Sequence, residues 1–175
     1  MDRIFWGMAF ILLDLDVNIG ERTLGVIPDW LGYWWLFRGF WELEEQWGGF
    51  RKWRRPAMVL AAYSAVVYVM HALVLSVRQE FLLWALGLVT AAAGVVMIWL
   101  VGRGIGHMEA QYGWDLRGGK LGSLWLYLAV MLVLDGLLGW MPLVGTVCAV
   151  AETVLALFWL AVLWDSRKRY IRSAE

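Results

Sequence analysis

The sequence predicts an all-α fold, a polytopic bundle of about six transmembrane helices with both termini in the cytoplasm. Apolar residues make up 62% of the 175 residues, and the mean hydropathy is +0.64. Charged residues make up 17%, whereas a soluble domain contains about a quarter. The apolar residues also gather in six runs separated by charged segments. This composition excludes disordered and disulfide-rich chains, and without a Pro/Gly/Ser-rich linker we expect one transmembrane domain over 1–175.

The six apolar runs are the expected helices, because a bilayer core about 30 Å thick requires about 20 helical residues. We expect spans at residues 4–19, 30–43, 56–77, 81–101, 121–140 and 143–164. The middle two are full-length, and the last two are equally long but each encloses an acidic residue. The first two are shorter and contain charges, so this N-terminal hairpin either crosses the membrane or only dips into it. No small-residue cleavage site follows the first run, which favours a retained helix over a signal peptide.

The basic residues indicate the orientation. With six spans, 12 of the 15 Lys and Arg residues fall on one side of the membrane. They are Arg3, Arg51, Lys52, Arg54, Arg55, Arg103, Arg117, Lys120, Arg167, Lys168, Arg169 and Arg172. Cytoplasmic loops are enriched in Lys and Arg, so both termini are expected in the cytoplasm; removing the first two spans leaves the same sides basic. We also expect anionic lipid headgroups to contact these loops.

Charged residues inside the spans are the main candidates for function, because burying one costs about 2.5 to 3.5 kcal/mol on insertion scales. Asp14 and Asp16 lie roughly 15 and 18 Å from the start of the first span at the helical rise. Arg38 lies roughly 18 Å from the inner end of the second span. These depths predict an intramembrane ion pair within the first hairpin.

A second interpretation of these charges is equally open. In it, the first helix ends at Leu13, so that the acidic residues after it are in contact with water. Arg38 then extends toward Glu42 and Glu45, which follow it on its own helix.

Asp14, Asp16 and Asn18 also form a weak candidate for a cation site, since they occupy alternate positions and each carries an oxygen ligand. They do not form an EF-hand loop, because Ile19 stands where glycine is required and Gly25 where glutamate is required. We expect no other cofactor.

The last hairpin repeats the scheme of the first in outline. Asp135 and Glu152 lie inside its two spans, and Arg38 and Glu152 each follow a proline, Pro28 or Pro142, by ten residues. Internal repeats of this kind are common in transporters, whose substrate sites lie near the membrane midplane. The match rests on few residues, so a true repeat is one of two interpretations, and chance similarity is the other.

An aromatic stripe runs along the second span, where Trp30, Trp34, Phe37 and Trp41 share one helical face. It either contacts lipid and neighbouring helices or forms the wall of an apolar ligand site, for which Trp34 is the candidate residue. In the third span, Tyr63, Ser64 and Tyr68 precede His71. We expect this histidine to be hydrogen-bonded to a neighbour rather than to be a ligand.

The longest hydrophilic segment, residues 102–122, contains glycines with flanking basic residues. No strand precedes the glycines and no Gly-Lys-Ser/Thr follows them, so neither nucleotide-binding fingerprint applies. We expect a flexible basic loop that contacts anionic headgroups.

Residues 13–20, Leu-Asp-Leu-Asp-Val-Asn-Ile-Gly, and 27–33, Ile-Pro-Asp-Trp-Leu-Gly-Tyr, resemble a group of small multi-pass membrane proteins of Gram-positive bacteria. The resemblance covers about a fifth of the chain. It implies a location in the bacterial inner membrane and supplies no activity. Size and span number are also similar to the substrate-binding subunits of energy-coupling factor vitamin transporters. Their small-x-x-x-small motif on the first helix is replaced here, where Leu13 follows Ala9 by four residues.

These features favour a small-solute or ion transporter, or its membrane-embedded substrate-binding subunit. The candidate ligand or ion-binding residues are Asp14, Asp16, Asn18, Trp34, Arg38, Asp135 and Glu152. One alternative is a non-catalytic partner or assembly protein, in which buried charges specify helix pairing. Another is a membrane enzyme acting on lipid or isoprenoid phosphates, although no nucleophile or metal cluster is recognisable. The expected partners are the bilayer, a small molecule or ion, and a second copy or a transporter subunit; a net charge of zero gives no argument for nucleic acid.

Overall fold

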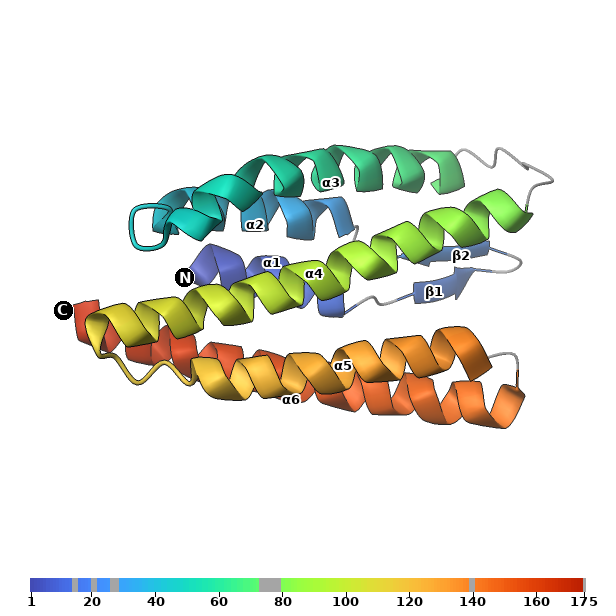
Figure 1. Ribbon diagram of the computed structural model, residues 1–175. Coiled ribbons are helices and arrows are strands. Elements are labelled where there is room, and N and C mark those ends of the chain that lie inside the picture. The colour runs from blue at the N-terminus through green and yellow to red at the C-terminus, as the bar shows by residue number, and fades with distance from the viewer. Residues whose placement is uncertain (14–15, 20–21, 26–28, 73–79, 139–140, 175) are drawn as a thin grey trace. The chain divides into compact units, whose positions relative to one another are not determined.

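The computed structural model describes residues 1–13, 16–19, 22–25, 29–72, 80–138 and 141–174. Its elements are α1 (Asp2–Leu12), β1 (Asp16–Ile19), β2 (Arg22–Gly25), α2 (Asp29–Leu43), α3 (Gly48–Ala72), α4 (Glu80–Tyr112), α5 (Gly118–Leu138) and α6 (Pro142–Ala174) (Figure 1). The six helices confirm the predicted all-α class, with one short hairpin added. The chain divides into two compact units, Met1–Val96 and Met97–Glu175, which we describe separately.

In the first unit, α1 packs against α2 through glycines. A Cβ atom at Gly7 would lie 2.8 Å from the carbonyl oxygen of Gly32, and one at Gly39 would lie 2.6 Å from Ile4 Cγ1. Neither position has room for a side chain, so the two helix backbones approach closely, as small residues allow. Ile4 and Met8 of α1 are fully buried.

Aromatic residues set the register of α2 against α3. The buried rings of Phe40 and Phe50 stack with their centroids 5.1 Å apart. A short turn over residues 44–47 joins the two helices, which therefore run antiparallel (Figure 1). Since both helices rise equally per residue, seven residues back from Phe40 and seven forward from Phe50 bring Tyr33 level with Ala57.

The prediction of a helical span over 4–19 is wrong. The helix α1 ends at Leu12, and β1 pairs antiparallel with β2 in a register that places Asp16 opposite Gly25 and Asn18 opposite Thr23. The physical reason is visible in β1, where polar Asp16 and Asn18 alternate with β-branched residues, a period of two that suits a strand. The second predicted run, 30–43, coincides with the helix α2, and its crossing of a membrane stays a prediction.

Three helices are longer than predicted, and one of them is α6, which continues to Ala174 rather than ending at residue 164. α3 begins at Gly48 rather than at residue 56, and α4 continues to Tyr112 rather than ending at 101. The expected loop over 102–122 is therefore wrong in extent, because only residues 113–117 connect α4 to α5. The extension of α4 is explained by Val101, Ile105 and Met108, which recur at helical spacing and are fully buried.

In the second unit, α5 packs against α6 as an antiparallel pair. The indole Nε1–H of Trp159 donates to the carbonyl oxygen of Leu121 at 3.2 Å. The hydroxyl of Ser166 donates to the carbonyl oxygen of Leu116 at 2.5 Å. By this register, Glu152 of α6 is level with the region of Leu128 on α5.

Among the residues that the structure describes, one stretch is long and apolar enough to cross a membrane, Leu143–Ser173 in α6. Only 28% of its most apolar part is buried, so α6 is not a covered core helix. In residues 143–164, the exposed large apolar side chains are Leu143, Val147, Val150, Val154, Leu157 and Phe158. Their spacing of mostly three or four residues places them on one face.

Candidate functional site

The helix α2 has two faces of different character. Its buried face includes Gly32, Tyr33 and Leu36, whereas Trp34 and Arg38 lie on the exposed face. The Arg38 guanidinium carbon lies 5.8 Å from the centroid of the Trp34 ring, a cation–π contact. In the aromatic stripe predicted from the sequence, Trp34 and Trp41 are exposed, whereas Trp30 and Phe37 are half-buried.

The predicted ion pair of the first hairpin falls outside the described residues on its acidic side. Asp14 is not described, and neither are the side chains of Asp16 and Asn18, so the pairing and the weak cation site both stay predictions. The alternative partner of Arg38, Glu42, instead pairs with Arg3 at 3.0 Å. Among the described side chains, no group of three His, Cys, Asp or Glu residues could hold a metal ion.

Glu152 lies in the middle of the apolar part of α6. At the helical rise it is roughly 15 Å from Pro142 and roughly 18 Å from Trp164. Its side chain is half-buried, and its Oε1 atom is shielded from solvent. The far end of this stretch is basic and carries Arg167 and Lys168. The guanidinium carbon of Arg167 and the Nζ atom of Lys168 lie 4.3 and 5.4 Å from the centroid of the Trp164 ring. The Asp135 side chain, predicted as its counterpart on α5, is outside the described residues.

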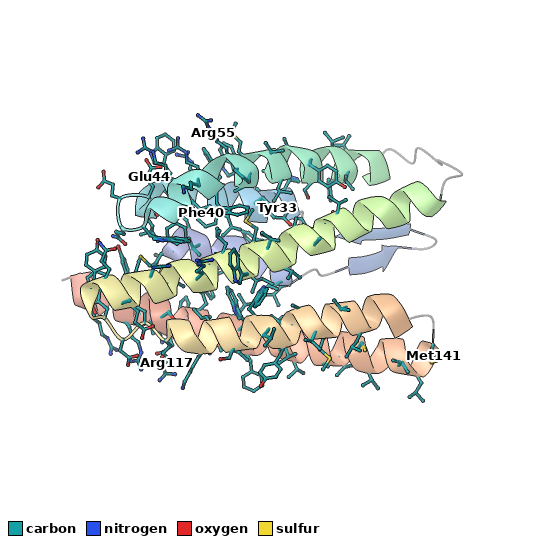
Figure 2. The ribbon with its side chains drawn as sticks, viewed as in Figure 1. Tyr33, Phe40, Glu44, Arg55, Arg117 and Met141 are labelled. Atoms are coloured by element: carbon teal, nitrogen blue, oxygen red, sulfur yellow. The ribbon has the colours of Figure 1, made fainter. Side chains whose placement is uncertain are left out.

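A group of polar side chains around the buried Tyr33 in the first unit was not predicted as a set. Tyr33 of α2 is 1% exposed, and its hydroxyl is buried without a hydrogen-bond partner among the described residues. Figure 2 labels Tyr33 and Phe40, which both belong to α2. The Phe40 ring stacks on Phe50 of α3. Asp29 precedes Tyr33 by one helical turn, and both Asp29 and Tyr63 lie within electrostatic range of the phenol. Ser64 of α3 is also buried.

The sequence contained part of the signal for this cluster. Tyr63 and Ser64 stood out as polar residues in an apolar span, but Asp29 and Tyr33 did not. The i, i+4 spacing of Asp29 and Tyr33 at the start of a mostly apolar helix is the signal that finds them, because it places both on one face.

The connection between α4 and α5 is held by ion pairs to α6. Arg117 Nε lies 3.0 Å from Asp165 Oδ2, and Arg169 pairs with both Asp165 and Asp115. Arg117 has a φ of 58°, and Glu109 accepts a hydrogen bond from the backbone N–H of residue 118 at 2.8 Å. The positive charges of this segment are thus partly neutralised, which argues against a preformed phosphate cradle.

No family model, curated protein or solved structure matches this chain.

Proposed function

We propose that the chain is a multi-pass protein of the bacterial inner membrane, with both termini cytoplasmic, that moves a small solute or ion across the membrane or binds it as a transporter subunit. Exposed apolar faces on more than one helix support multiple crossings. On α3 they include Met58, Val59, Val66 and Val69, and on α5 Leu126, Tyr127, Val130, Val133 and Leu134. Surfaces of this kind on a small chain indicate contact with lipid or with other proteins.

The ends of the apolar parts of these helices also carry the chemistry of a membrane interface. Arg54, Arg103 and Arg167 each lie over a tryptophan ring, with distances to the centroid of 5.2, 5.1 and 4.3 Å. Tryptophan is enriched at the headgroup level, and basic residues one turn farther out meet anionic phosphates. The spans and the anionic-lipid contacts predicted from the sequence are consistent with these pairs.

Glu152 is the observation that carries the transport proposal. It is an ionisable group near the middle of the helix best suited to cross the bilayer, and part of its carboxylate is shielded from solvent. Such a group is costly in hydrocarbon unless it contacts a polar partner, a proton or a passing ion. A carboxylate at this depth is the typical element of a coupling or substrate pathway.

The test is flux through purified protein in liposomes. Sodium, potassium, methylammonium and acetate are supplied outside, an internal pH dye reports proton movement, and uptake is compared with that of empty liposomes. We expect at least one flux that Glu152→Gln reduces to the level of empty liposomes. Glu45→Gln, at an exposed glutamate outside the helices, is the matched control and should retain the flux. Flux that is equal in the two variants, or no flux in any arm, would contradict the proposal.

A non-catalytic partner protein is the second candidate, and the exposed face of α6 favours it. In that case Glu152→Gln changes co-purification with a partner rather than flux. The phosphate-directed enzyme is less well supported, because Arg117 and Arg169 are already paired with carboxylates.

A further inference from the structure

The most informative feature outside the predicted site is the Tyr33 hydroxyl. Tyr33 lies on the side of α2 that faces α3, since Phe40, two turns later, stacks on Phe50. Helical side chains lean toward the N-terminus of their helix, so the phenol extends from the level of Ala57 toward that of Ala61 and Ser64. All three of these α3 residues are small and buried. The hydroxyl therefore lies at the level of a part of α3 whose side chains are small and covered by their neighbours.

A buried hydroxyl with no partner among the described residues requires an explanation, because nearly all such groups in folded proteins are hydrogen-bonded. A phenylalanine ring at position 33 would make the same apolar contact without a hydroxyl, as Phe40 does two turns later on this helix. The hydroxyl adds one donor and one acceptor to an apolar contact. A bound molecule with a complementary polar group would satisfy it.

The surrounding charge and rings indicate which polar group that is. Asp29 supplies a carboxylate on the same face of α2, and Tyr63 supplies a second phenol within electrostatic range of Tyr33. A protonated amine is complementary to all three, because it donates N–H bonds to the phenol and carboxylate oxygens and is attracted to aromatic faces. A hard metal ion fits less well, since it requires about six oxygen ligands.

We propose that Asp29, Tyr33, Tyr63 and Ser64 form a binding site for a small protonated primary amine between α2 and α3. The inference deepens the proposed function by naming a ligand class, and it is tested by binding alone. The ligand must be small, because Ala57 and Ala61 on this face of α3 are already covered by their neighbours.

The experiment uses the full chain in lipid nanodiscs and measures equilibrium binding of radiolabelled methylammonium. We expect saturable binding that unlabelled methylammonium displaces, whereas acetate, of the wrong charge, and tetramethylammonium, without N–H donors, do not. Tyr33→Phe should weaken binding by about tenfold or more, the loss of one hydrogen bond to a charged group. Asp29→Asn should weaken it at least as much. Tyr127→Phe, at an exposed tyrosine of α5, should leave it unchanged.

Absence of methylammonium binding to the wild-type chain, or equal affinity in Tyr33→Phe and wild type, would overturn the inference. The melting temperature of each variant, measured in the same nanodiscs, separates a lost site from a lost fold. Glu152-dependent flux without amine binding would refute this site and leave the proposed function intact. Amine binding without flux in any arm would support this site and contradict the proposed function.

Discussion

Replacing Tyr33 by Phe should stabilise the ligand-free protein. The substitution removes one buried oxygen whose hydrogen-bonding capacity no described residue meets, and it keeps the ring that fills the contact with α3. Relief of an unsatisfied buried group is worth about 1 to 3 kcal/mol. The void left behind is smaller than a methyl group and costs less than about 1 kcal/mol. The net gain in the free energy of unfolding is therefore about 1 to 2 kcal/mol.

For a chain of this size, that gain corresponds to a rise in melting temperature of about 2 to 8 °C. Differential scanning calorimetry in detergent measures it, with Tyr127→Phe as the matched control because its hydroxyl belongs to an exposed residue. A melting temperature that falls in Tyr33→Phe would mean that the hydroxyl has a partner, and the reasoning would be refuted. Added methylammonium should raise the melting temperature of the wild type more than that of Tyr33→Phe at the same concentration, since stabilisation by a ligand decreases with its affinity for the native state.

Three further substitutions test the packing of each unit, with thermal unfolding as the measurement. Gly39→Leu should destabilise the first unit by about 2 kcal/mol or more, because its side chain would clash with Ile4, and a melting temperature equal to that of wild type would contradict the close contact of α1 and α2. Ser166→Ala should cost about 1 to 2 kcal/mol by removing the buried hydrogen bond to Leu116, whereas Ser173→Ala, at an exposed serine, should cost nothing measurable. Asp165→Asn should cost less than about 1 kcal/mol, since its ion pairs are partly exposed and screened, and a loss that 1 M salt does not diminish would count against this view.

The sequence predicted elements well where one mostly apolar run coincides with one helix. The run 30–43 corresponds to α2 and the run 143–164 to the apolar part of α6. The sequence-based prediction failed where the apolar content of a segment suggests one element and the period of its apolar residues suggests another. Around Asp16 the alternation belongs to a strand, although the residues before it are apolar enough for a helix. Along α4, Gly102, Gly104 and Gly106 interrupt the apolar pattern, so the sequence did not reveal that Val101, Ile105 and Met108 form a buried helical face.

The candidate site divides in the same way. The depth of Glu152 follows from counting residues along an apolar helix, so the sequence was sufficient to find it. The burial of Tyr33 depends on which face of α2 meets α3, and this is decided by contacts between residues distant in the chain, such as Phe40 with Phe50. A single sequence contains no direct signal for such contacts.

The contacts of Ser166, Asp165 and Arg169 with residues 115–117 have a consequence for the order of synthesis. The α4–α5 connection leaves the ribosome about fifty residues before the groups that hold it. During translation this connection therefore has no partners from α6, and it becomes fixed only after Asp165, Ser166 and Arg169 have been made. The second unit is thus completed by residues of α6, and a nascent chain halted before Asp165 would carry an unsecured connection at the cytoplasmic side that we propose for it.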